Sequence, residues 1–302
     1  MIHFLQRLSQ AFLHAIFPPK CLICSSYYAW QPSAGKLGSD LISDSTAPYF
    51  CESCRTGLIP IASPFCSKCG LPFVSREGDS HTCYECLLEL QKRAHSPSRQ
   101  SGTAGLASES KNDKIPYSRR FPVPLERDCR ELQKKHFRMA RAFGVYDGSL
   151  MEAIHLLKYG KKTFLSRPLS ILARKTFFQF WDVDAIDLLV PVPLHIKRLR
   201  ERGFNQAHLL IRRWAKQEHI PCDGLTLFRT RWTEPQTTLS RTDRQKNIKG
   251  AFSLRRPENI KGHRILLVDD VYTTGATVNE CARVLMEAGA EFVDVLTLAR
   301  AV

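Results

Sequence analysis

The sequence predicts an α/β fold with a mainly parallel sheet flanked by helices for residues 136–302, behind a small cysteine-rich domain at residues 1–91. In the C-terminal part, apolar runs typical of buried strands alternate with segments of helical spacing, and this alternation builds parallel sheets. In the N-terminal part, eight cysteines fall into four C-x-x-C pairs. Residues 92–135 are polar and rich in small residues, so we predict a largely disordered linker there.

The chain begins with a short amphipathic segment, Met1–Phe17. Its apolar residues recur at helical spacing, which predicts a helix packed on its own domain, with a membrane-surface helix as the alternative. The segment lacks a small-residue cleavage site, and no apolar run approaches the roughly 20 residues that a membrane span needs. We therefore expect a cytoplasmic protein without a signal peptide and with no membrane span.

The C-terminal part contains the predicted elements of the sheet. Strands are expected at 142–146, 186–192, 265–268 and 292–298, and helices at 150–158, 168–181, 207–214 and 278–286. The run from Ile186 to Val192 is almost continuously apolar, which indicates a strand buried on both faces. Gly289 is the expected C-cap of the helix that precedes the last strand.

The four C-x-x-C pairs supply enough thiolates for two tetrahedral Cys₄ zinc sites of the zinc-ribbon type. Without a secretory signal a disulfide framework is not expected, and no strand–helix context supports a redox motif. We favour two sequential sites with a structural role, and interleaved pairing is the alternative. The sequential sites are Cys21, Cys24, Cys51 and Cys54, and Cys66, Cys69, Cys83 and Cys86.

The most specific motif is ILLVDDVYTTGAT, residues 265–277. A buried strand ends in Asp269 and Asp270, a loop of small and hydroxyl residues follows, and a helix begins. Ligands of open parallel sheets bind beyond the carboxyl ends of strands, and helix N-termini bind phosphate. Gly275 allows close approach of the backbone to such a phosphate. The alternative is a plain strand–turn–helix with a capping threonine and a chance acidic pair.

Two basic segments extend the predicted site. Residues 191–207 crowd four cations before Gly203 and leave a strand at its carboxyl end, as the acidic motif does. Residues 235–252 carry four further cations and are long for a connection, which indicates a lid. Solvated basic loops are the alternative for both segments, and nucleic-acid contact is a further alternative for the second. The net charge of +15 favours anionic partners without choosing among polyphosphates, nucleic acid and acidic lipid.

Residues 268–277 closely resemble the 5-phosphoribosyl 1-pyrophosphate (PRPP) motif of type I phosphoribosyltransferases. With the cysteine pairs, LKYGKK at 157–162 and the two basic segments, they make residues 1–91 and 136–302 similar to the ComF family. This resemblance implies a type I phosphoribosyltransferase-like fold behind a double zinc ribbon, PRPP bound with Mg²⁺, and a link to uptake or use of external DNA. The implied PRPP-binding residues are Arg202, Gly203, Asp269, Asp270, Val271, Tyr272, Thr273, Thr274, Gly275, Ala276 and Thr277. The implied catalytic residues are Asp269, Asp270, Arg202, Arg241 and Arg244.

Three functions are compatible with these residues. The first is an active phosphoribosyltransferase, a pentosyl-group glycosyltransferase of unknown acceptor, and the presence of both carboxylates and all the cationic loops favours it. The second is a non-catalytic regulator that binds PRPP or a related ribose phosphate or nucleotide. The third is a cytoplasmic adaptor for single-stranded DNA, with competence or helicase proteins as partners. Phe204 and Trp232 lie near basic residues, which is weak support for the third.

Overall fold

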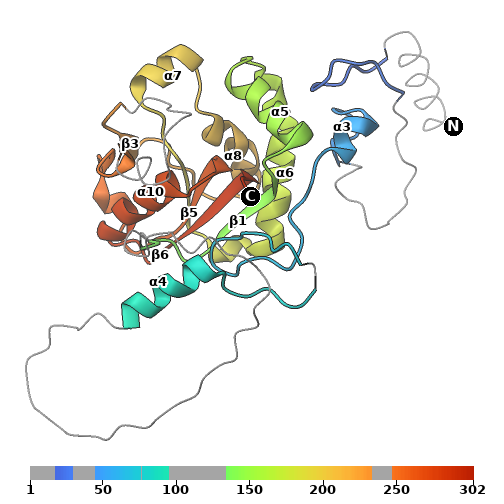
Figure 1. Cartoon of the computed structure of the whole chain (residues 1–302). Coiled ribbons are helices and arrows are strands. Elements are labelled where there is room, and N and C mark those ends of the chain that lie inside the picture. The colour runs from blue at the N-terminus through green and yellow to red at the C-terminus, as the bar shows by residue number, and fades with distance from the viewer. Residues whose placement is uncertain (1–17, 30–44, 76, 95–133, 233–246) are drawn as a thin grey trace, which may run out of the picture. The chain divides into compact units, whose positions relative to one another are not determined.

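A computed structural model describes residues 18–29, 45–75, 77–94, 134–232 and 247–302 (Figure 1). The predicted helix at Met1–Phe17 and most of the predicted linker lie outside the described residues, and the predicted domain boundaries stay predictions. Residues 84–134 form a unit of their own, in which helix α4 (Tyr84–Ala94) is described, and the rest of the chain forms the other unit. Among the described helices, none combines the length and apolarity needed to cross a bilayer.

Four parallel strands form the central sheet in the order β1, β6, β5, β2. Their bounds are β1 (Ala140–Val145), β2 (Leu188–Pro191), β5 (Arg264–Tyr272) and β6 (Phe292–Arg300). This arrangement confirms the predicted α/β class with a mainly parallel sheet. Strands β5 and β6 are longer than predicted, because their pairing continues until Tyr272 lies opposite Arg300. The acidic pair was predicted to end the strand, and β5 instead continues for two residues beyond it, to Tyr272.

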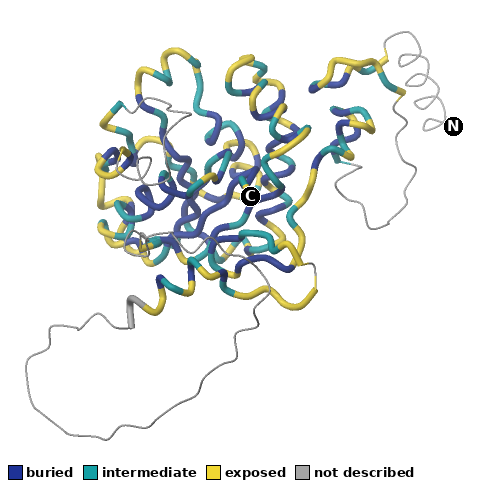
Figure 2. The backbone as a smooth tube through the Cα atoms, in the orientation of Figure 1, coloured by how far each residue is buried: buried dark blue, intermediate teal, exposed yellow. Residues whose placement is uncertain are grey.

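Helices pack on both faces of this sheet. The packed helices are α5 (Gly148–Lys158), α6 (Ser166–Phe180), α8 (Gln206–Gln217) and α10 (Ala276–Glu287). A further short helix, α7 (Ile196–Arg202), buries none of its residues. Successive strand residues point to opposite faces, so Leu266 packs in the core of α5, α6 and α8 while Leu267 packs in the core of α10. Burial on both faces explains the near-continuous apolar runs in the sequence, and Figure 2 shows the resulting buried centre.

Shorter elements complete the described chain. Strands β3 (Leu227–Arg229) and β4 (Phe252–Leu254) form an antiparallel pair on either side of the undescribed residues 233–246. The other short elements are helix α3 (Glu52–Thr56) and single 3₁₀ turns at Thr163–Leu165, Val183–Ala185 and Pro257–Asn259.

The segment after α3 runs along the outer edge of β1. The amide of Ile61 donates to the carbonyl of Phe143, and the amide of Val145 donates to the carbonyl of Ile59, both over 2.9 Å. An added Cβ at Gly144 would lie 2.5 Å from the Ile59 carbonyl oxygen, so this close pairing requires glycine. The segment satisfies the edge groups of β1, which would otherwise be open to pairing with another chain.

Candidate functional site

Two carboxylates lie next to each other near the C-terminal end of β5. Asp269 is half-buried, Asp270 is buried, and the Asp270 amide donates a 2.9 Å hydrogen bond to the Asp269 carboxylate. Burial, together with repulsion from Asp270, raises the pKa of Asp269 to about 7. Two ionised groups at this depth are costly without cations or hydrogen-bond donors, so the pair is suited to a ligand that supplies them.

Lys158, the last residue of α5, already supplies one cation to the pair. Its Nζ lies 2.9 Å from a carboxylate oxygen of Asp270, and both side chains are largely buried. Burial by itself lowers the pKa of Lys158, but attraction to Asp270 and Asp269 outweighs burial and raises that pKa. Lys158 therefore stays charged and neutralises one carboxylate of the pair.

The loop after β5 turns at Gly275, which has a left-handed φ of +78° and serves as the N-cap of α10. An added Cβ at Gly275 would collide with the hydroxyl and ring of the buried Tyr272, so both conformation and space require glycine. The Thr274 hydroxyl accepts a 3.4 Å hydrogen bond from the Ala276 amide. The first amides of α10 lack intrahelical acceptors, and together with the threonine hydroxyls they can bind an anion.

The first basic segment is helical at its centre, where the sequence predicted a loop. Helix α7 spans Ile196–Arg202 because the His195 side chain accepts from the Lys197 amide at its start and Gly203 ends it with a left-handed φ of +83°. Arg202 Nη1 donates to Gln206 over 2.5 Å, and its guanidinium carbon lies 5.6 Å from the ring centre of Tyr159. Burial lowers the pKa of Arg202 and the nearby Asp270 opposes that shift, so this arginine lies within electrostatic reach of the acidic pair.

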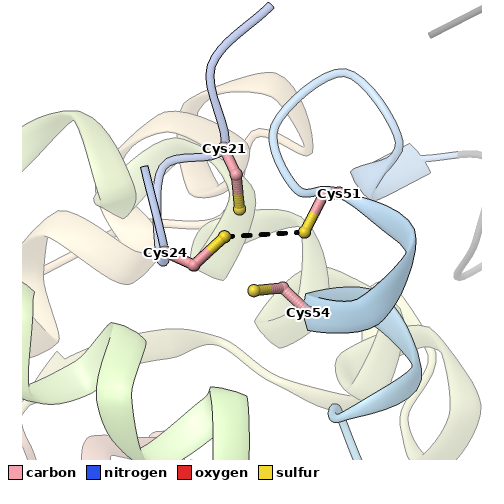
Figure 3. Close-up of side chains that lie close together, drawn as sticks. All are labelled: Cys21, Cys24, Cys51 and Cys54. Carbon is pink, nitrogen blue, oxygen red and sulfur yellow. Dashed lines mark hydrogen bonds between the residues drawn. The ribbon is translucent and has the colours of Figure 1, made fainter. Parts of the chain in front are cut away.

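The first cysteine group has the geometry of a metal site. The sulfurs of Cys21, Cys24, Cys51 and Cys54 lie within 4.8 Å of one another and converge from two segments of the chain (Figure 3). The Cys24 and Cys51 sulfurs are 3.6 Å apart. Zinc–thiolate bonds of about 2.3 Å in a tetrahedron place sulfurs about 3.8 Å apart, so the donor set fits zinc.

The second group joins the remaining pairs. The sulfurs of Cys66, Cys69, Cys83 and Cys86 also lie within 4.8 Å of one another, and those of Cys69 and Cys83 are 3.8 Å apart. The amides of Cys69 and Cys83 each donate to the Cys66 sulfur over 3.3 Å, which stabilises a thiolate at this position. The structure thus has the sequential grouping that the sequence favoured, and not the interleaved one.

Comparison with known proteins assigns a family. A model described as "Double zinc ribbon domain" matches residues 12–87, and one described as "Phosphoribosyl transferase domain" matches residues 202–301. Over 162 residues the chain is 37% identical to "DNA utilization protein YhgH" of Escherichia coli (strain K12), covering 51% of this chain and 69% of that protein. The chain belongs to the ComF family.

Two further relatives carry competence names. This ComF-family chain is 35% identical over 162 residues to "Competence protein F" of Haemophilus influenzae, covering 52% of this chain and 71% of that protein. It is 32% identical over 164 residues to "Competence protein ComFC" of Bacillus subtilis, covering 54% of this chain and 65% of that protein. The resemblance stated from the motifs is confirmed, as is a phosphoribosyltransferase-type α/β domain with an N-terminal zinc ribbon.

Sequence reasoning identified the acidic pair and the loop of this candidate site but missed Lys158. The residue belongs to LKYGKK, which served only as a sign of the family. It meets Asp270 from α5, 112 positions earlier in the chain, so no local pattern connects the two residues. The sequence offered one indication of this role: Lys158 is a basic residue at the end of a helix that follows a strand of the sheet.

The structure describes residues 247–252 of the predicted lid, whereas residues 235–246 lie outside the described residues. Arg241 and Arg244 lie outside the described residues. Arg231, just before the undescribed segment, donates to the carbonyls of Asn247 and Lys249 over 2.5 and 3.0 Å. These contacts hold the two ends of the segment together.

The two aromatics noted in the sequence differ in their surroundings. Phe204 is partly buried and packs against the core of α6 and α8. Trp232 is half-buried, and the Lys197 Nζ and the Arg198 guanidinium carbon lie 5.6 and 5.3 Å from its ring centres. Of these two aromatic residues, Trp232 is the one with cations next to its ring.

Proposed function

We propose that this ComF-family protein binds PRPP, or a closely related ribose phosphate, at Asp269–Thr277 and transfers its phosphoribosyl group to an acceptor. One observation carries the proposal: two carboxylates and a left-handed glycine loop lie together where β5 leads into α10. Open α/β sheets bind ligands at this edge, beyond the carboxyl ends of their strands. The phosphoribosyl transferase model that matches residues 202–301 covers the same loop.

The groups of the site match the groups of such a ligand. Ribose hydroxyls are donors, and we assign them to the carboxylates of Asp269 and Asp270. We assign the 5-phosphate to the amides at the start of α10 and to the hydroxyls of Thr273, Thr274 and Thr277. The backbone of Val271, Gly275 and Ala276 completes the cradle, and Tyr272 supports it from beneath.

Transfer also requires charge stabilisation at the leaving group. Loss of pyrophosphate leaves positive charge on the sugar and negative charge on the departing oxygens. We assign Arg202 and the adjacent Gly203 to the pyrophosphate, with Arg241 and Arg244 approaching from residues 233–246 as part of a lid. The carboxylate oxygens of the acidic pair suit Mg²⁺, which when bound would neutralise pyrophosphate charge.

Isothermal titration of the zinc-loaded protein with PRPP and Mg²⁺ tests the binding step. We expect binding by the native protein and at least a tenfold loss in the double variant Asp269→Asn/Asp270→Asn. Asp187→Asn is the matched control, because Asp187 pairs with Arg264 over 2.7 Å at the opposite end of β5. Failure of the native protein to bind millimolar PRPP, or equal affinity in the double variant, would refute the proposal.

Pyrophosphate release separates an enzyme from a regulator. Candidate acceptors are added to the PRPP-bound protein, and free pyrophosphate is measured with a coupled assay. We expect release that depends on both acceptor and Arg202, because that cation stabilises the leaving group. PRPP binding without release from any acceptor would favour the non-catalytic regulator.

A role in the use of single-stranded DNA is the second candidate, and we propose that the protein acts in the cytoplasm. The names of the relatives and the cations around Trp232 support this candidate. We expect Arg198→Ala to weaken binding of a fluorescent oligonucleotide, and higher salt to weaken it further. Arg174→Ala is the control, since Arg174 also stacks on an aromatic ring but pairs with Glu218. If both variants bind the oligonucleotide equally well, Trp232 and its neighbouring cations do not form the DNA-binding surface.

A further inference from the structure

A continuous set of contacts joins the second cysteine group to the phosphate loop. Arg300, the last residue of β6, is buried, and its Nη1 donates to the carbonyl of Cys69 over 2.6 Å. Its Nη2 lies 3.5 Å from the Cys69 sulfur. These two contacts fix the guanidinium against both the backbone and the ligand atom of one cysteine.

Charge explains why an arginine occupies this position. A buried guanidinium needs a counter-charge, and the contacting side-chain atom here is a metal-ligand sulfur. Four thiolates around one Zn²⁺ carry a net charge of −2, so the loaded cluster is the counter-charge that Arg300 faces. Hydrogen bonds from outside the ligand set orient the ligands of metal sites, and Arg300 serves Cys69 in this way.

The same guanidinium reaches the loop through Tyr272. Arg300 and Tyr272 are paired across β6 and β5, and the guanidinium carbon lies 4.3 Å from the Tyr272 ring centre. The Tyr272 hydroxyl and ring occupy the space where a Cβ of Gly275 would lie. The Phe137 ring packs against the Tyr272 ring nearly at a right angle, with 6.3 Å between the ring centres. Tyr272 therefore has little room to move without moving Gly275.

We propose that Arg300 and Tyr272 are positioning residues through which zinc in the second cysteine group holds the phosphate loop in its binding conformation. Zinc occupancy of Cys66, Cys69, Cys83 and Cys86 then sets the affinity of the loop for a sugar phosphate. The coupling is reciprocal, so a ligand on the loop also increases retention of this zinc. The link itself is independent of the ligand's identity, whereas its effect on affinity rests on the proposed function.

Hydrogen–deuterium exchange tests the link without a ligand. Arg300→Met removes both contacts to Cys69 and the cation over Tyr272, while Arg300→Lys keeps the charge but loses the two-point contact. We expect the amides of residues 273–279 to exchange at least fivefold faster in Arg300→Met, with an intermediate rate in Arg300→Lys, at unchanged exchange in α8. Unchanged exchange of the loop in zinc-loaded Arg300→Met would overturn the proposal.

Arg138→Lys provides the matched control. Arg138 also stacks on an aromatic ring, 3.7 Å from the centre of Phe292, and pairs with a polar partner, Asp294, at 2.6 Å. Its partners Phe292 and Asp294 lie at the start of β6, whereas Arg300 lies at the end of that strand. Faster loop exchange in Arg138→Lys, equal to that in the Arg300 variants, would show general loosening of the sheet and would refute a specific link.

Zinc retention tests reciprocity in the native protein. A colorimetric chelator is added with and without PRPP and Mg²⁺, and released zinc is followed over time. We expect PRPP to slow release of one zinc at least threefold and to leave release of the other unchanged, and Arg300→Met to abolish this protection. If the native protein binds no PRPP but Arg300→Met still exchanges its loop amides faster, PRPP is excluded as the ligand and the link through Arg300 and Tyr272 is supported. If PRPP binds equally well to native protein and Arg300→Met, the link fails and the proposed function stands.

Discussion

At the scale of single residues, the ionisation of Asp269 lowers the stability of the free protein. The pKa of Asp269 is about 7, above that of an aspartate in the unfolded chain. Between about pH 4 and pH 7 the folded state therefore keeps the carboxyl proton that the unfolded state has lost. Stability is therefore lost as the pH rises from about 4 to about 7. Under the proposed function, this carboxylate serves the ligand at the expense of the free protein's stability.

Asp269→Asn should reverse that loss. We expect the variant to be more stable than the native protein at pH 8, by on the order of 1 kcal/mol, because the amide removes the repulsion from Asp270. The advantage should shrink at pH 5, where Asp269 is protonated. Thermal unfolding at both pH values measures this, and a variant that is less stable at pH 8 would show that Asp269 is favourably ionised in the free protein.

Gly275→Ala should abolish PRPP binding and leave zinc content unchanged. The added Cβ would meet the Tyr272 hydroxyl at a left-handed φ of +78°, so the loop must rearrange. Gly262→Ala is the control, since Gly262 has a φ of +75° but no heavy atom within 4 Å of an added Cβ. Titration with PRPP measures both variants, and native-like affinity in Gly275→Ala would exclude the phosphate from this loop.

At the scale of elements, the end of α5 and the end of β5 depend on each other. The ion pair of Lys158 with Asp270 is mostly hidden from water, with side chains 15% and 5% exposed. Losing one partner of a buried pair leaves an uncompensated charge. The helix thus contributes to the site through a residue that local sequence patterns do not connect to it.

Lys158→Met should therefore destabilise the fold by about 3 kcal/mol. We expect the double variant Lys158→Met/Asp270→Asn to recover most of that loss, because both charges are then absent. Denaturant-induced unfolding measures the cycle. The control is Lys161→Met in the same LKYGKK motif, where the side chain is exposed and the effect should be within about 0.5 kcal/mol. Additive single effects would mean that the pair does not couple.

Sequence reasoning at this scale was accurate where patterns are local. It predicted the strands of the sheet, because burial on both faces leaves apolar runs such as Ile186–Val192. It did not predict helix α7, because that helix is defined by the His195 cap and the left-handed Gly203 within a polar, basic segment. Such a segment has no apolar periodicity to signal a helix.

At the scale of the whole molecule, residues 59–70 of the cysteine-rich part contact strand β1 directly. Residues 59–61 pair with the edge of β1, and Arg141 Nη2 donates to the carbonyl of Ser67 over 2.9 Å. Added bulk at Gly70 would meet the Ala140 carbonyl, with 2.5 Å between the Cβ and the oxygen. Zinc bound by Cys66 and Cys69, which lie in this segment, would therefore also stabilise the edge of the sheet.

The native chain should bind two zinc ions, one for each cysteine group. We expect Cys24→Ser to reduce the content to about one, because three thiolates hold zinc less tightly than four. Cys222→Ser should keep two, since Cys222 lies outside both groups. Mass spectrometry of the metal content after dialysis measures all three proteins, and a loss of zinc in Cys222→Ser would contradict the assignment.

By itself, the sequence determined the α/β class, the eight cysteines in four C-x-x-C pairs and the position of the candidate phosphate loop at Asp269–Thr277. Each of these follows from local spacing and residue type. The tertiary structure alone decided that Lys158 meets Asp270 and that Arg300 meets Cys69, 231 positions away. Those contacts depend on the strand order β1, β6, β5, β2 and on the register that sets Tyr272 opposite Arg300. Strand order and register are set by packing between segments that are distant in the sequence, so local sequence patterns do not predict them.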